Sequence, residues 1–359
     1  MANFNKFQLI VLAAFVVFII AGVAAFAMYR GGSQSQSLPA ITIWGTFPAD
    51  KFNNYVNTIN NTAAIPINIT YAQKSASQFS QDFIAALARG NGPDAILIPA
   101  ELILSHEDKL ALIPYSSLSQ RDFLDIYISE AKMYLTTNGI IGFPFAIDPM
   151  VMYWNRDMFD AAGLATYPQY WDDFGPLTKA LTVKDANNNI RKSAIAMGQF
   201  SNVNNAREIL GTLFMQSGNP VTTQGANGIV VNNVNLNANV SPESAIKYFI
   251  QFINPSNPYY SWNRSLPESK SAFLSGTLAT YFGFASELTD IRAKNPNLNF
   301  DVALMPKPKT GGLATNYGRM YGFSLVRSST KLDAAYSIIS TLSATQSLSD
   351  LSKSMYCLT

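Results

Sequence analysis

Apolar and polar positions between residues 40 and 100 repeat with two different periods, which predicts alternating strands and helices. The segments AITIWG and INITYA alternate as strands do, and AILIP is a short apolar run typical of a strand buried on both faces. Between them, Phe79, Phe83 and Leu87 share one face of a predicted helix that ends at RGNGPD. Alternating βαβ units of this kind predict an α/β fold with a mostly parallel sheet covered by helices.

A second group of elements is predicted from about residue 148 onward. The stretch YPQYWDDFGPLTKAL spaces its apolar residues for one helix face, and SPE at residues 241–243 is typical of a helix start. The segments LATYFGF, NFDVALMP and GGLATNYGRMYGFSLV predict further strands. A helix that begins near Lys331 has a broad apolar face, which suits packing on the first group of elements.

The longest apolar run covers residues 9–28, carries no charge and is long enough to cross a bilayer as one helix. A cleaved signal peptide has a shorter apolar region, although Ala25-Phe26-Ala27 offers a small-x-small cleavage site. We therefore expect residues 1–30 to form a single membrane anchor, with a signal peptide as the alternative. A flexible tether at residues 31–39 would hold the remaining chain at the membrane, outside the cytoplasm.

Composition excludes several classes of function. The net charge of +2 gives no basic face for nucleic acid. The single Cys357 and single His106 can form neither an internal disulfide nor a zinc cluster, so no metal and no cofactor is expected. An aromatic content of 12% with only 13% charged residues suits a core, and also suits a cleft in which sugar rings stack on aromatic side chains.

Two motifs that suggest ion or phosphate binding are better explained as turns. DANNNI starts like a calcium loop, but Ile190 and Ala196 stand where such a loop needs Gly and Glu. RGNGPD follows a helix and precedes a strand, which is the opposite of the order in a phosphate-binding loop. Asp148 and Glu287 are the one acid pair considered for glycoside hydrolysis, and the sequence does not fix their separation.

Candidate ligand residues lie where predicted strands end, because ligands gather at the carboxyl ends of parallel strands. Trp44 and Thr46 end the first strand, and Glu101 follows the strand AILIP. Free backbone donors at the start of a second-region helix can hold a polar ligand. The candidates there are Asn204, Asn205 and Arg207.

Asp148 is a lone carboxylate between two apolar segments in GFPFAIDPMVMYWNRDMFDAAGL. Burying a carboxylate is costly unless it is paired or hydrogen-bonded. Asp148 therefore either meets a structural partner, such as an arginine or the following backbone, or faces a cleft in which a ligand binds.

Four stretches, in this order, resemble a known family. They are ALARGNGPDAILIP, then NGIIGFPFAIDPMVMYWNRDMFDAAGL followed by YPQYWDDF, then SAFLSGTLATYFGF, and finally VALMPKPKTGG with YGFSLV. Together they cover about residues 40–345 and are similar to the extracellular solute-binding proteins of ATP-driven (ABC) importers, specifically the maltose-binding-protein-like, carbohydrate-class group.

The resemblance implies two α/β lobes joined by a hinge, the periplasmic-binding-protein fold, here preceded by one N-terminal transmembrane helix. Lobe 1 would take residues 38–146 and 305–345, and lobe 2 residues 147–304. A small polar ligand, expected to be a sugar or oligosaccharide, would bind between the lobes of a monomer and pass to an ABC permease. The protein would catalyse nothing. A ligand sensor for a signalling partner and a tethered glycosidase are the alternatives.

The resemblance also assigns ligand residues at the two predicted crossings between lobes. Asp148 would accept hydrogen bonds from sugar hydroxyls, since a carboxylate offers two acceptor oxygens and no donor. The resemblance also implies ligand roles for Phe284 and Ser286 after LATYFG, where relatives often carry a stacking aromatic residue. Arg319 and Tyr321, at the return crossing, would be hinge or ligand residues.

The sequence departs from the family in two places. The lipid-anchoring cysteine is absent, and the chain stops at Thr359 where the family continues with several helices that complete lobe 2. From this we expect those C-terminal helices to be missing and lobe 2 to be protected more weakly than lobe 1.

Overall fold

The computed structural model describes residues 39–62, 66–219, 222–225, 228–231 and 242–344. The predicted anchor and tether lie outside the described residues. So does the segment from residue 345 onward, to which the expectation of missing C-terminal helices refers. Within the described part of the chain, no helix combines the length and apolarity needed to span a membrane.

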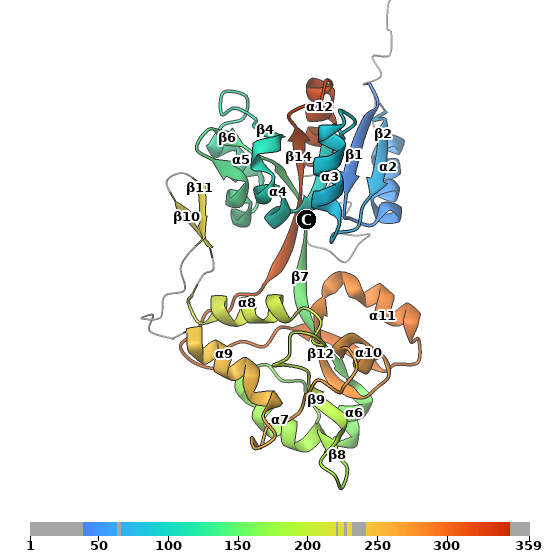
Figure 1. Cartoon of the computed structure of the whole chain (residues 1–359), viewed down its shortest axis with the longest axis vertical. Coiled ribbons are helices and arrows are strands. Elements are labelled where there is room, and N and C mark those ends of the chain that lie inside the picture. Colours follow the sequence, from blue (N-terminus) through green and yellow to red (C-terminus); the bar gives the residue numbers. More distant parts are fainter. Residues whose placement is uncertain (1–38, 63–65, 220–221, 226–227, 232–241, 345–359) are drawn as a thin grey trace, which may run out of the picture.

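The chain folds into two lobes, one above the other in Figure 1. The elements of the upper lobe are β1 (Ile41–Gly45), α2 (Ala49–Thr62), β2 (Ile69–Gln73), α3 (Phe79–Ala88), β3 (Ala95–Pro99), α4 (Ala100–Ser105), the 3-10 helix η1 (Glu107–Lys109), β4 (Leu110–Ala111), α5 (Gln120–Ile126), η2 (Ser129–Tyr134), β5 (Leu135–Thr136), β6 (Gly139–Ile140) and, from late in the chain, α12 (Leu332–Leu342). The helix predicted near Lys331 is α12, and its apolar face is buried in this lobe.

The lower lobe is formed by the middle of the chain. Its elements are α6 (Arg156–Ala161), η3 (Trp171–Asp173), α7 (Phe174–Leu181), β8 (Val183–Lys184), β9 (Ile190–Ile195), α8 (Ala206–Gln216), α9 (Pro242–Ile250), η4 (Gln251–Ile253), α10 (Ser269–Leu274), β12 (Leu278–Phe284), η5 (Ala285–Glu287), α11 (Leu288–Lys294) and β13 (Phe300–Leu304). A hairpin of β10 (Thr222–Gly225) and β11 (Gly228–Val231) extends from this part of the chain to the side of the upper lobe, near β5 (Figure 1).

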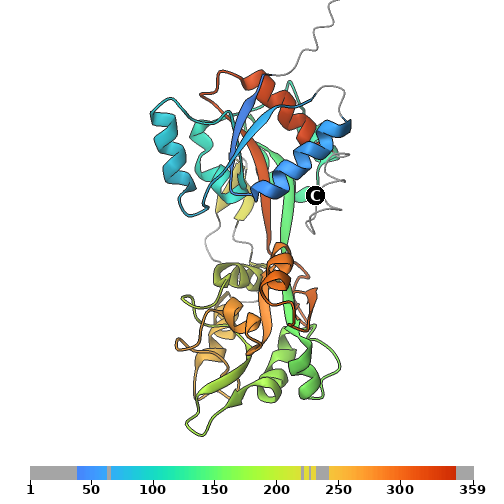
Figure 2. The ribbon, with the colours of Figure 1, turned by 90° about the vertical axis from the view of Figure 1, so that its right-hand side faces the viewer.

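Two long strands, β7 (Phe143–Asn155) and β14 (Gly318–Val326), carry the chain between the lobes. They lie side by side in both ribbon views (Figure 2). The first half of β7 pairs with β14, and its second half pairs with β12 and β13. One sheet therefore runs through both lobes in the order β2-β1-β3-β14-β7-β12-β9-β8.

The prediction of a mostly parallel sheet is only partly correct, because the sheet mixes parallel and antiparallel pairs in both lobes. β2, β1 and β3 are parallel, but β14 is antiparallel to both β3 and β7. The reason is topological, because β14 enters the sheet from the lower lobe whereas its neighbours run toward that lobe. The carboxyl ends of β1 and β3 still meet at the edge that faces the lower lobe, as the candidate residues require.

Each lobe has its own hydrophobic core. Buried residues between 41 and 146, together with those between 320 and 342, form the first core. Buried residues between 150 and 305 form the second. The division falls within β7, between Ala146 in one core and Met150 in the other.

Gly322 makes the close packing at the crossing possible. A Cβ atom built on Gly322 would lie 2.9 Å from the carbonyl oxygen of Phe143 and closer still to the buried ring of Tyr134. We expect Gly322→Ala to destabilise the protein by about 1–3 kcal/mol, since a backbone carbonyl and a buried ring cannot easily move. Urea unfolding measures this loss.

Gly318→Ala, four residues earlier on the same strand, is the matched control. Its Cβ would come too close only to the Cγ2 methyl of Ile147, at 2.9 Å, and that side chain can shift; the nearest backbone atom would lie 3.9 Å away. Equal unfolding midpoints for the two variants would show that the crossing is not tightly packed at Gly322.

Candidate functional site

Charged side chains from both lobes meet between α8 and α4. Arg207 Nη2 lies 2.7 Å from Glu208 Oε1 and 3.8 Å from Glu101 Oε1. Arg207 and Glu208 belong to α8 in the lower lobe, whereas Glu101 belongs to α4 in the upper lobe. The hydrogen bond to Glu208 raises the pKa of Arg207 above its ordinary value. A single guanidinium therefore bridges the two lobes.

Arg319, on the crossing strand β14, extends this group of charges. Its Nη2 lies 4.0 Å from the same Glu208 Oε1, and its guanidinium carbon lies 4.0 Å from the centre of the Phe284 ring. Glu208 is only 6% exposed, and a buried carboxylate requires such partners. Cations over an aromatic face are attracted by the ring quadrupole. Glu101, Arg207, Glu208 and Arg319 are called the interlobe charge network below.

Asp148 lies beside this network, in register with Arg319 on the neighbouring strand. Its side chain is buried and accepts two hydrogen bonds from Ser286, from the backbone N at 3.0 Å and from Oγ at 2.5 Å. Burial raises the pKa of Asp148, while the bonds from Ser286 and the charge of Arg319 oppose the rise. The structural partner of Asp148 is thus Ser286, which the resemblance also implies as a ligand residue.

Strand periodicity and helix packing explain why these groups meet. Tyr317, Arg319 and Tyr321 alternate along the chain and so share one face of the crossing segment. Thr212 Oγ1, one turn after Glu208 on α8, accepts a hydrogen bond from Tyr317 N at 3.3 Å and holds the helix against this segment. Burial raises the pKa of Tyr321, and Arg319 lowers it in turn by its charge and a hydrogen bond.

The end of β1 supplies the upper-lobe wall. Trp44 is half-buried, and Lys74 Nζ lies 3.9 Å from the centre of its ring. Thr46 Oγ1 is buried and has no hydrogen-bond partner among the described residues. Phe47 packs edge-on against Tyr321 with ring centroids 5.2 Å apart, which joins this wall to β14.

Three of the predicted ligand residues have structural partners within the lower lobe. Asn204 Oδ1 accepts bonds from Ser269 Oγ at 3.1 Å and from the backbone N of Lys270 at 2.9 Å. Asn205 Nδ2 points inward to the carbonyl of Phe282 at 3.3 Å. The Phe284 ring is buried at 2% exposure beneath Arg319, so in this arrangement it offers no open stacking face.

The acid pair considered for catalysis is also occupied. Glu287 Oε2 accepts from Lys270 Nζ at 2.7 Å and from Tyr281 at 2.9 Å, and its Oε1 caps the backbone N of Phe284 at 2.9 Å. Asp148 is held by Ser286, as described above. Among residues 39–344, apart from the undescribed gaps, no group of three His, Cys, Asp or Glu side chains could hold a metal ion.

Glu208 and Tyr317 belong to this site but were not among the predicted ligand residues. Glu208 connects both arginines, and the pKa of Tyr317, raised mainly by burial, is also shifted by Glu101 and Arg207. Two signals could have found them. Glu208 adjoins Arg207 at a helix start in a chain with few charges, and Tyr317 lies two residues before Arg319 on a predicted strand.

The side chains of this arrangement can donate hydrogen bonds to a polar molecule and accept them from it. Its carboxylates and guanidiniums are paired with one another, and hydroxyl and aromatic groups flank them. Residues 49–357 match the family model of the bacterial extracellular solute-binding proteins. The chain belongs to this family. No curated protein sequence matches the chain closely enough to count as a relative.

Solved structures of solute-binding proteins share the two-lobed fold of this family member. The cyclic α-maltosyl-1,6-maltose-binding protein of Arthrobacter globiformis superposes with a TM-score of 0.67 at 19% identity, covering 89% of this chain and 78% of that one. An ABC substrate-binding protein of Listeria monocytogenes in complex with cycloalternan gives 0.66 at 16% identity, covering 87% and 77%. The GacH receptor of Streptomyces glaucescens, solved unliganded and with acarbose, gives 0.65 at 14%, covering 89% and 79%.

Burial of Asp148 makes stability depend on pH in a definite direction. Because folding raises the pKa of Asp148, its carboxyl group contributes to the free energy of unfolding in full below the ordinary pKa of 3.8. This stabilisation is lost as the pH rises through the pKa of the folded state. Asp148→Asn cannot ionise and escapes this loss. We expect the melting temperature of Asp148→Asn minus that of the wild type to increase between pH 4 and pH 7.

Ser286→Ala provides the matched comparison. Ser286 Oγ lowers the pKa of Asp148, so removing this hydroxyl should raise that pKa further. The loss of stability with rising pH should therefore be larger in Ser286→Ala than in the wild type. A difference between Asp148→Asn and wild type that stays constant across the range would mean that Asp148 does not carry a buried charge.

Proposed function

We propose that this protein captures a neutral sugar or short oligosaccharide between its two lobes and delivers it to the permease of an ABC importer. The observation that carries the proposal is the interlobe charge network, in which groups from α4, α8 and β14 converge beside Asp148 and Ser286. Family membership and the saccharide ligands named for the structural neighbours support the ligand class.

The pairing of charges supports a neutral ligand. Glu208 Oε1 already attracts the guanidiniums of Arg207 and Arg319, and Asp148 is held by Ser286. A charged ligand would have to compete with these pairs, whereas a polyol can share their remaining lone pairs and protons. Trp44, half-buried beside Lys74, is the candidate stacking ring, and Thr46 supplies a hydroxyl without a protein partner among the described residues.

Closure of the lobes is the proposed binding step. Pro149 on β7 lies opposite Gly318 on β14, so a glycine stands at the point where β14 enters the upper lobe. A ligand that contacts both lobes favours the arrangement in which they approach each other. We take residues 38–146 with 305–345 and residues 147–304 as the two moving units, and Arg319 and Tyr321 as both hinge and ligand residues.

The remaining proposals concern the setting of the protein. The uncharged run at residues 9–28 supports a membrane anchor and a binding domain outside the cytoplasm, next to the permease. We also propose that the protein acts as a monomer and performs no catalysis.

A thermal-shift screen of the protein against neutral mono- and oligosaccharides tests the function directly. A ligand present at 100 times its Kd should stabilise the folded state by about 2.7 kcal/mol. Acidic and amino sugars form the comparison set. Stabilisation by no member of the library, or by charged sugars alone, would overturn the proposed ligand class.

Asp148→Asn should weaken binding of the sugar found in that screen by about 1.5–3 kcal/mol, because a charge-assisted hydrogen bond is lost. Isothermal titration calorimetry measures this loss. Asp160→Asn, at an exposed position of α6, is the control and should bind as the wild type does. Unchanged affinity combined with a lower melting temperature would assign Asp148 a purely structural role.

The contact between Glu101 and Arg207 should contribute little, since both side chains are largely exposed. We expect Glu101→Gln to change Kd by less than about fivefold at low salt, with the difference disappearing at high salt. Glu107→Gln, on the same lobe, is the control. A large and salt-independent loss in Glu101→Gln would mean that Glu101 contacts the ligand itself.

A further inference from the structure

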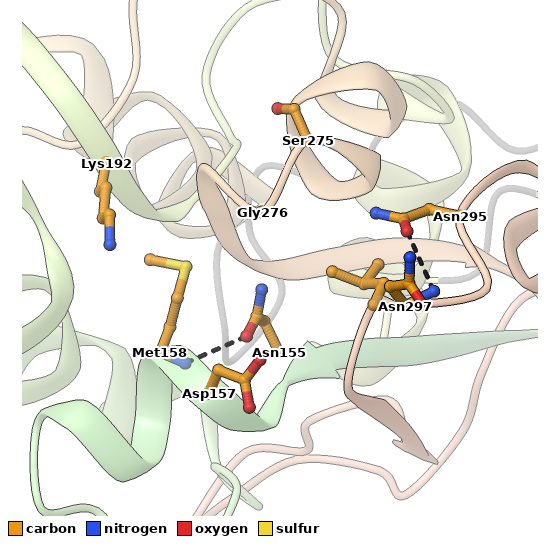
Figure 3. A pocket seen from close by; sticks show the side chains of 9 residues that line it. Asn155, Asp157, Met158, Lys192, Ser275, Gly276, Asn295 and Asn297 are labelled. Carbon is orange, nitrogen blue, oxygen red and sulfur yellow. Dashed lines mark hydrogen bonds between the residues drawn. The ribbon is translucent and has the colours of Figure 1, made fainter.

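An open pocket lies in the lower lobe, at the end of β7 that points away from the upper lobe. It has a volume of about 200 Å³ and lies between the start of α6, the turn from α10 to β12, and the loop after α11 (Figure 3). It shares no residue with the interlobe site. Its volume is below the usual range for drug-sized ligands, so it suits a molecule of about one sugar ring.

Asn155 is the feature that identifies the pocket as a binding site. The residue is 3% exposed, and its Oδ1 caps α6 by accepting the backbone N of Met158 at 3.0 Å. Its Nδ2 points into the pocket in Figure 3, and none of the hydrogen bonds of the described residues uses it as a donor. An amide donor without a protein acceptor is available to a hydroxyl group of a bound molecule.

Gly276 keeps the space beside this donor open. Its φ of +72° belongs to a turn that disfavours other residues, and a Cβ added there would lie 3.9 Å from Asn155 Nδ2. The glycine therefore fixes the turn and also leaves the amide accessible from the pocket.

The remaining wall offers both donors and acceptors, and its formal charges cancel. Lys192, on β9, has no ion-pair partner among the described residues and enters from one side. One carboxylate oxygen of Asp157 accepts a hydrogen bond from Asn299 Nδ2 at 2.7 Å, which leaves its second oxygen as an acceptor for a ligand. Asn297 lies across the pocket, and Met158 supplies an apolar surface.

We propose that this pocket binds a small neutral polyhydroxylated molecule, such as a monosaccharide or cyclitol, independently of the site between the lobes. Hydroxyl groups both donate and accept, as the amide, ammonium and carboxylate of the wall require. An anion would meet the carboxylate of Asp157, and a cation would meet the ammonium of Lys192. Carbon–hydrogen faces of the ring would pack on Met158.

Saturation-transfer difference NMR of the full chain with myo-inositol as the probe tests the proposal. Asn155→Asp keeps an acceptor for the Met158 backbone and removes the donor, so binding should weaken by about tenfold or more. Lys192→Met, at an exposed position, should weaken binding by a smaller factor. Asp148→Asn, which alters only the interlobe site, should bind the probe as the wild type does.

Each contrary result is distinct. Equal binding to wild type and Asn155→Asp would overturn the site, and if Asn155→Asp fails to fold, unchanged binding to Lys192→Met would do the same. Displacement of the probe by acetate or phosphate would make the pocket an anion site and overturn the ligand class. Loss of binding only in Asp148→Asn would place the probe between the lobes, which overturns this proposal and leaves the proposed function intact.

Discussion

The antiparallel pairing of β7 with β14 is the constraint on which the rest of this protein depends. These two strands carry the chain between the lobes, and their register sets Asp148 against Arg319 and Pro149 against Gly318. Beyond Met150, β7 exchanges β14 for β12 and β13, so one strand belongs to the cores of both lobes. A shift of one residue would reverse every side chain of β14 and remove Arg319 from the site.

Buried charge is tolerated at this crossing because each group has at least one partner supplied by another element. Glu208 is satisfied by arginines from α8 and β14, and Asp148 is satisfied by Ser286 on η5. Glu287 in turn fixes η5 by capping the backbone of Phe284. The polar groups between the lobes are therefore held in place before any ligand arrives, which lowers the entropic cost of binding.

The two candidate sites differ in the groups that form them and in the number of lobes that contribute. Between the lobes, paired charges and half-buried aromatic rings are contributed by elements of both lobes. The pocket at the end of β7 is built within one lobe and depends on a single buried amide, Asn155, left open by a glycine turn. The proposed site in this pocket therefore does not depend on the closure that we propose for the site between the lobes.

The sequence by itself determined the elements, the two-lobed class and the family, because periodicity and short ordered motifs are local properties of the chain. The face of α12, the strand AILIP and the two crossings were all predictable in this way. Which side chains meet was decided only by the tertiary structure. Ser286 reaches Asp148 across 138 positions, and Asn204 accepts a hydrogen bond from the start of α10. Such partners depend on strand register and helix packing over long separations, and no local pattern in the sequence encodes them.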